Sequence, residues 1–192
     1  MKNKLVVLVD IDNILNNFSE VCIRLFNKNH NTEHKLENIT TYDLCSSFNY
    51  DDRDDFINNY LLSEEVSKQC TPLKNAVKYL EMINNVCSVY IVTARDWKQL
   101  TNIMDWFNKY FPFIKDTQLI RCVNKDRIRG DILIDDNLDN ILNFSGGRIL
   151  FDYGWNRNVE DVTHFINRVH NWEECWNIIN LILKPNKGDV KV

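Results

Sequence analysis

Two carboxylates follow the first apolar run of the chain. Residues 5–9 are all apolar, and Asp10-Ile11-Asp12 comes directly after them. Such a run predicts a buried parallel strand, and because side chains alternate along a strand, Asp10 and Asp12 should emerge on the same side. Ligands of open α/β sheets bind at the carboxyl ends of the strands, where a carboxylate pair can hold a hard cation or act on a phosphate. Aspartate is also a common turn residue, so the pair alone leaves a structural role open.

Further chemically suitable side chains stand at or near the ends of other predicted strands: Thr93, Lys125, Asp135 and Asp136. Thr93 follows the apolar run 88–92, the second aspartate pair follows the run 132–134, and Lys125 lies in the loop before that run. Parallel strands of one sheet bring their ends to one rim. A threonine can instead cap a helix, and a lone lysine commonly lies on the surface. Their joint occurrence at strand ends favours a functional site.

Helical patterns separate these strands. Apolar residues recur at helical spacing over 18–26 and 73–83, around Trp97, Leu100, Met104 and Phe107, and in a final helix that holds Trp172, Trp176, Ile179 and Leu183. Two more short strands are expected at 119–123 and, as the last one, at 148–151. This alternation predicts an α/β fold whose parallel sheet is covered by helices on both faces.

The segment between the first helix and Pro72 differs in composition. Residues 27–70 are polar, asparagine-rich and acidic, with an acidic cluster at 51–55 before a short apolar stretch. Carboxylates are favoured at a helix N-terminus, so we interpret the cluster as the solvated start of a helix. The few apolar residues cannot bury a large area alone. We therefore predict a small helical cap of residues 17–70, inserted after the first strand into a core made of residues 1–16 and 71–192.

Composition and charge narrow the class of protein. The chain has 192 residues, of which 44% are hydrophobic and 26% charged, as in ordinary globular domains. A net charge of −4 provides no basic field for a nucleic acid polymer, whereas a small anionic substrate fits. No run approaches the roughly 20 apolar residues of a membrane span, and the run before Asp10 is too short for a signal-peptide core.

We therefore expect a cytoplasmic protein that binds neither a membrane nor a nucleic acid polymer. Its six cysteines are scattered without metal-binding spacing and are expected to be reduced, mostly buried thiols. The sequence leaves open whether the chain forms a homodimer.

The ordered set of residues resembles the haloacid-dehalogenase-like phosphatase superfamily. Its four motifs are matched by Asp10-x-Asp12, Thr93, Lys125 and Gly130-Asp131-x-x-x-Asp135-Asp136. More closely, residues 131–136 together with the downstream Trp155-Asn156-Arg157 and Asn171-Trp172 look like the 5'(3')-deoxyribonucleotidase family. The resemblance covers nearly the whole chain. It implies the Rossmann-like parallel sheet of that superfamily with a small cap, and a Mg²⁺-dependent phosphatase that hydrolyses nucleoside monophosphates.

The resemblance, with the chemistry of phosphate esters, implies a role for each residue. Asp10 would attack phosphorus and form an aspartyl-phosphate. Asp12 would protonate the leaving sugar oxygen and later accept a proton from the hydrolytic water. Thr93, Ala94 and Lys125 would bind and stabilise the transferring phosphoryl group.

The same resemblance implies a site for Mg²⁺, which prefers oxygen ligands and keeps several waters. The ligands would be the Asp10 carboxylate, the main-chain carbonyl of Asp12, and a carboxylate from Asp135 or Asp136.

Three departures from the family pattern concern the substrate more than the reaction. Asn13 stands where the superfamily usually has glycine, but asparagine tolerates a left-handed backbone better than most residues. Animal members of the nucleotidase family carry serine after the motif threonine and arginine two residues before the motif lysine, whereas this chain has Ala94 and Val123. The contacts to phosphate or sugar are therefore expected to differ.

Aromatic residues of the cap are candidates for contact with the nucleobase. Phe18 falls where the family has such an aromatic, and Tyr42 and Phe48 are further candidates, although each can instead pack the cap on the core. Asn156 and Arg157 are expected to fix a loop near the site rather than to touch substrate, and Trp172 to lie in the core.

Three hypotheses follow. The leading one is a nucleoside monophosphate phosphatase with a preference for deoxyribonucleotides. The second is a phosphatase for another small phosphate ester, because base selectivity would lie in the cap. The third is a catalytically idle binding domain, against which the clustered carboxylates argue, since they repel one another without a cation.

Overall fold

The computed structural model describes residues 4–96, 100–157 and 166–184. Its centre is a six-stranded parallel sheet with the strand order β3-β2-β1-β4-β5-β6. The strands are β1 (Val6–Val9), β2 (Ser88–Thr93), β3 (Leu119–Arg121), β4 (Ile132–Asp135), β5 (Gly147–Phe151) and β6 (Ile166–Val169). The predicted α/β class and parallel sheet are confirmed.

One expectation about the sheet is wrong: the strand at 148–151 is not the last. β6 pairs in parallel with β5 at the edge of the sheet. Its sequence, Ile-Asn-Arg-Val, alternates over only four residues, which is too short a pattern to predict a strand by itself.

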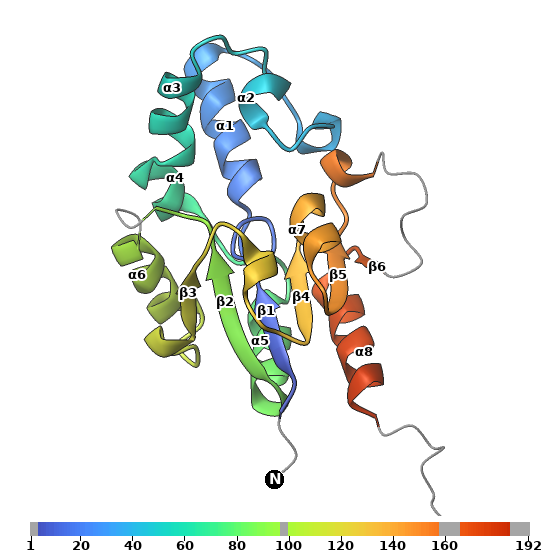
Figure 1. Cartoon of the computed structure of the whole chain (residues 1–192). Coiled ribbons are helices and arrows are strands. Elements are labelled where there is room, and N and C mark those ends of the chain that lie inside the picture. Colours follow the sequence, from blue (N-terminus) through green and yellow to red (C-terminus); the bar gives the residue numbers. More distant parts are fainter. Residues whose placement is uncertain (1–3, 97–99, 158–165, 185–192) are drawn as a thin grey trace, which may run out of the picture.

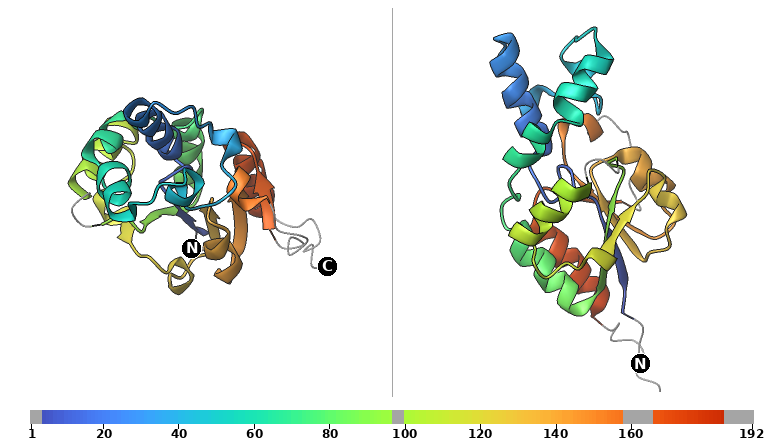
Figure 2. Two further views of the ribbon diagram at one scale, coloured as in Figure 1. Left: turned by 90° about the horizontal axis from the view of Figure 1, so that it is seen from above. Right: turned by 90° about the vertical axis from the view of Figure 1, so that its left-hand side faces the viewer.

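Helices cover both faces of the sheet, as the right-hand view of Figure 2 shows. Val7 and Val9 pack on one side with α5 (Ala76–Val86), α6 (Leu100–Tyr110) and α8 (Trp172–Leu183). Leu8 points to the other side, where α7 (Leu138–Asn143) supplies Ile141. This alternation explains why β1 must be apolar at every position. Trp97, predicted to belong to the helix that is now α6, lies outside the described residues.

A helical insertion (residues 17–70) stands over the carboxyl ends of the strands (Figure 1). It consists of α1 (Phe18–His30), a 3₁₀ turn (Leu36–Asn38), α2 (Leu44–Ser47), α3 (Arg53–Phe56), a π-helical turn (Ile57–Leu61) and α4 (Glu64–Gln69). Its buried side chains form a hydrophobic cluster of their own around Phe26, Phe56 and Tyr60. The acidic cluster does begin a helix, because the Asp52 side chain accepts the Asp55 N–H at 2.9 Å.

Short 3₁₀ turns complete the structure at Asp116–Gln118, Lys125–Arg127 and Gly154–Asn156. The last of these lies against the insertion: a Cβ on Gly154 would collide with the Ile39 carbonyl oxygen, so only glycine permits this approach. Within the described residues, no helix combines the length and apolar character needed to cross a membrane. Five of the six cysteines are buried.

Candidate active site

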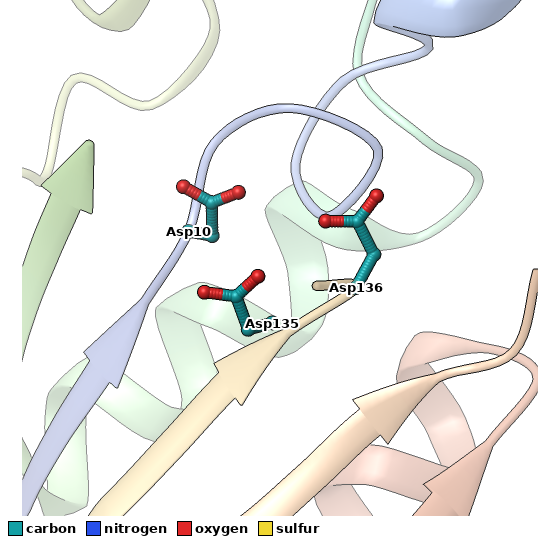
Figure 3. Close-up of side chains that lie close together, drawn as sticks. All are labelled: Asp10, Asp135 and Asp136. Atoms are coloured by element: carbon teal, nitrogen blue, oxygen red, sulfur yellow. The ribbon is translucent and has the colours of Figure 1, made fainter. Parts of the chain in front are cut away.

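Three carboxylates converge at the rim formed by the ends of β1 and β4. Asp10 follows β1, Asp135 ends β4, and Asp136 comes next. One oxygen of each lies within 4.8 Å of the others, and all three side chains are buried. Figure 3 shows the three side chains close together beyond the ends of their strands. Because β1 and β4 are hydrogen-bonded neighbours, residues 125 positions apart in the sequence meet at this rim.

Lys125 neutralises part of this cluster. Its Nζ lies 2.6 Å from Asp10 Oδ1 and 2.7 Å from Asp135 Oδ2, and the residue is 2% exposed. The turn Lys125–Arg127 directs the side chain inward, although a lysine is seldom buried unless it is paired. Burial opposes its charge, but the two carboxylates outweigh that and hold the pKa of Lys125 above its ordinary value.

The adjacent aspartates differ in their partners. Both oxygens of Asp135 are engaged: Oδ1 accepts the Asn137 N–H at 2.8 Å, and Oδ2 accepts from Lys125 and from Asn140 Nδ2 at 3.0 Å. Asp136 Oδ2 accepts from Asn13 Nδ2 at 3.0 Å. Asp136 Oδ1, although buried, has no hydrogen-bond partner among the described residues. A buried unpaired carboxylate oxygen is costly, so this atom is the one suited to a cation.

One ammonium does not balance three buried carboxyl groups. Burial is the largest cause that raises the pKa of Asp10 to about 7, against the opposing effect of Lys125. Burial and the neighbouring Asp135 hold the pKa of Asp136 well above its usual range. A further positive charge at this place would stabilise the ionised forms of both. The all-oxygen donor set matches the ligands that Mg²⁺ prefers.

A cavity of about 690 Å³ opens between this rim and the helical insertion. It is lined by all of the predicted catalytic and phosphate-binding residues, namely Asp10, Asp12, Thr93, Ala94 and Lys125. The predicted base contacts Phe18 and Tyr42 also line it. Phe48 does not line it and is instead buried among the aromatic residues of the insertion. The volume is in the range of small-molecule sites.

The two predicted base contacts have different surroundings. Phe18 is only 9% exposed, and its ring faces the guanidinium of Arg95 at 4.7 Å from the ring centre. Tyr42 is 56% exposed at the cavity and packs edge-on against Trp155, with 6.5 Å between ring centres. Trp155 also lines the cavity and stacks on Tyr153.

Sequence reasoning missed Arg95, whose guanidinium donates two hydrogen bonds to the Asp12 carboxylate. Its place in the sequence, two residues after Thr93 at the end of β2, could have indicated a role at the rim. Asn13 was noted for its backbone only. Its φ of 60° confirms the left-handed turn, while its side chain also binds Asp136 and accepts the Ser19 N–H at 2.9 Å.

The downstream residues support the rim as expected. Asn156 is fully buried, and its Nδ2 donates to the main-chain oxygens of Asp136 (2.9 Å) and Phe151 (2.8 Å). Arg157 pairs with Asp152. Trp172 lies in the core and donates its indole N–H to the Ile14 carbonyl at 2.8 Å.

Residues 4–185 match the family described as 5' nucleotidase, deoxy (pyrimidine), cytosolic type C protein. The chain belongs to this 5'-nucleotidase family. It is similar to a 5'(3')-deoxyribonucleotidase of Bacillus subtilis, with 29% identity over 174 residues that cover 89% of this chain and 96% of that protein. It is also similar to a 5'(3')-deoxyribonucleotidase of Clostridium acetobutylicum, with 38% identity over 96 residues that cover 50% of this chain and 51% of that protein.

Solved structures place the nucleotidase-family chain in the haloacid-dehalogenase-like fold. A haloacid dehalogenase-like hydrolase from Streptococcus pneumoniae aligns with a TM-score of 0.64 at 13% identity, over 93% of this chain and all of that one. A magnesium-bound HAD-hydrolase from Bacillus subtilis aligns with a TM-score of 0.58 at 16% identity, over 93% of this chain and all of that one. The predicted fold class is thereby confirmed.

Proposed function

We propose that this chain is a Mg²⁺-dependent phosphatase that hydrolyses nucleoside monophosphates, preferably deoxyribonucleotides, to nucleoside and phosphate. One observation carries the reaction type: the buried Asp10, Asp135 and Asp136 carboxylates converge beside Lys125 at the edge of a cavity large enough for a nucleotide. Membership of the 5'-nucleotidase family and the names of the relatives support the substrate class.

The metal ligands that we propose are the Asp10 carboxylate, the Asp12 main-chain carbonyl and the Asp136 carboxylate. The unpartnered Asp136 Oδ1 favours Asp136 over Asp135, whose oxygens are already engaged. When bound, Mg²⁺ would neutralise the repulsion between the substrate phosphate and the attacking carboxylate. The magnesium-bound relative of known structure supports this choice of ion.

The remaining chemistry follows from the positions of the side chains. Asp10 is proposed to attack phosphorus and carry the phosphoryl group as an aspartyl-phosphate, with Asp12 as the acid for the leaving oxygen and then the base for water. Lys125 and Thr93 would donate hydrogen bonds to the phosphoryl oxygens, where negative charge develops. Ala94, exposed at the cavity, would border the same group.

The helical insertion is proposed to act as a cap of residues 17–70 that shapes the pocket and excludes water. Tyr42, exposed at the cavity, is the better placed of the two predicted base contacts to meet a nucleobase, and Phe18 would act from the cavity wall. A cytoplasmic location, as the family description indicates, is part of this proposal.

The test is hydrolysis by the purified protein of a panel of esters with and without Mg²⁺. The panel contains dUMP, dTMP, the corresponding ribonucleotides and sugar phosphates. We expect hydrolysis of the nucleotides that EDTA abolishes, and no hydrolysis by Asp10→Asn. Asp116→Asn, at an exposed position outside the cavity, is the matched control and should keep full activity. Preference for a sugar phosphate would favour the second hypothesis, a phosphatase for another small phosphate ester. Inactivity on every ester would favour the third, a catalytically idle binding domain.

A further inference from the structure

Arg95 holds the Asp12 carboxylate in one orientation. Its Nε donates to Asp12 Oδ2 at 2.7 Å and its terminal NH2 donates to Oδ1 at 2.5 Å, which is the bidentate arrangement of a guanidinium on a carboxylate. Asn16 Nδ2 adds a third bond to Oδ1 at 3.1 Å. The Asp12 side chain remains 25% exposed, whereas that of Arg95 is 9% exposed. These bonds fix the orientation of the Asp12 carboxylate, and Asp12 still lines the cavity.

The guanidinium is itself fixed by the helical insertion. The NH1 group donates to Ser67 Oγ in α4 at 3.2 Å, and the Phe18 ring of α1 covers its face at 4.7 Å. Arg95 therefore has partners on its nitrogens and on one face. A long side chain held in this way loses little further freedom when it orients Asp12.

We propose that Arg95 is a positioning residue for the transfer of a proton from Asp12 to the leaving oxygen. The inference rests on the proposed function, in which Asp12 is the general acid. In that step the bond between phosphorus and the leaving oxygen breaks as the bond to Asp10 forms. The Asp12 proton moves to the leaving oxygen, and Asp12 becomes a carboxylate. The bidentate pair with Arg95 fixes the orientation of the Asp12 side chain for this step.

This role differs from merely joining the insertion to the core. If Arg95 had only a structural role, its loss would slow all substrates by the same factor. If it positions the acid, the loss depends on the leaving group, because an alkoxide must be protonated as it departs whereas p-nitrophenolate is stable as an anion. The value of kcat/KM reports the steps up to departure of the leaving group, so it isolates this difference from the later hydrolysis of the intermediate.

The experiment compares kcat/KM for dUMP and for p-nitrophenyl phosphate at saturating Mg²⁺. We expect Arg95→Met to lower the value for dUMP by ~10–100-fold, part of the effect of a general acid, and the value for p-nitrophenyl phosphate by less than about threefold. Most of the loss for dUMP should lie in kcat rather than KM. Arg95→Lys keeps the charge without the bidentate geometry and should show the same selectivity with a smaller loss.

Two controls complete the design. Asp12→Asn should show the same leaving-group selectivity, and adding Arg95→Met to it should cause no further selective loss, because both changes remove one interaction. Arg24→Met removes an exposed arginine of α1 whose side chain donates to Gln69 at 2.9 Å, and both esters should be hydrolysed as by the wild type.

The inference would be overturned if Asp12→Asn showed leaving-group selectivity but the folded Arg95 variants did not. In that case Arg95→Met and Arg95→Lys would lower kcat/KM equally for both esters, or would lower it for neither. A wild-type protein that hydrolyses neither ester would overturn the proposed function, and this inference with it. Thermal unfolding followed by circular dichroism establishes that each variant is folded.

Discussion

At the scale of the residue, the two adjacent aspartates of the rim show how hydrogen bonding gives chemically identical side chains different roles. Asp135 is saturated by Lys125, Asn137 and Asn140, so it orients the lysine. Asp136 keeps one buried oxygen without a partner. The sequence predicted both as metal ligands without choosing between them, because the choice depends on where donors from three other segments lie.

Substitutions of these aspartates should therefore have different effects. Asp136→Asn is expected to weaken Mg²⁺ binding by at least ~10-fold, as measured by isothermal titration calorimetry. Asp135→Asn should bind the ion more nearly as the wild type does, but lose about 1–3 kcal/mol of unfolding free energy, because buried Lys125 loses a charged partner. Intact Mg²⁺ binding by Asp136→Asn and its loss in a folded Asp135→Asn would reverse our assignment.

At the scale of the element, strands and helices with long patterns were predictable and short ones were not. β1, β2 and β4 are apolar runs that end in polar residues, so their type and the position of their ends could be inferred from the sequence. β6 and the subdivision of the insertion into short helices could not, because four to six residues carry too little pattern and tertiary contacts decide their conformation. The candidate site was predictable to the extent that it lies at the ends of the long strands.

A second cluster of charged side chains, centred on Asp152, holds the segment after β5. It was not predicted from the sequence. Asp152 is bonded by Arg157 (2.6 Å) and by Arg168 (2.8 Å), and His170 Nδ1 lies 3.3 Å away. Burial opposes the charge, but the arginines outweigh it and hold the pKa of Asp152 below its ordinary value of 3.8. Arg168 also donates to Asn156, which holds the main chain of Asp136. The cluster thus supports the rim from outside the cavity.

Asp152→Asn should lower the unfolding free energy at pH 7 by about 1–2 kcal/mol, since the arginines lose a charged acceptor. A carboxyl group with a depressed pKa in the folded state stabilises above its unfolded pKa, and this contribution disappears as the pH falls through the folded value. In urea denaturation, the difference in unfolding free energy between variant and wild type should therefore stay constant from pH 7 to about pH 5 and shrink as the pH falls further. A difference independent of pH would show that the effect is not electrostatic. Asp116→Asn serves as the exposed control.

At the scale of the whole molecule, the topology places the insertion over the site. The chain leaves the sheet after β1, builds α1 to α4, and returns through α5 to β2 (Figure 1). Because β1 lies between β2 and β4, Asp10 meets both Thr93 and the second aspartate pair at one rim. The parallel sheet could be expected from the resemblance. The bond between Arg95 and Asp12 could not, since it depends on how α1 and α4 pack over the rim.

The central claim is that Asp10 carries the phosphoryl group, and rapid acid quenching during turnover of dUMP tests it most directly. With Mg²⁺ present, peptide mass spectrometry of the quenched protein should find a phosphoryl group on Asp10 that is absent without the ion. Phosphorylation of a different residue, or undiminished dUMP hydrolysis by Asp10→Asn with no phosphorylated protein in the wild type, would contradict the account.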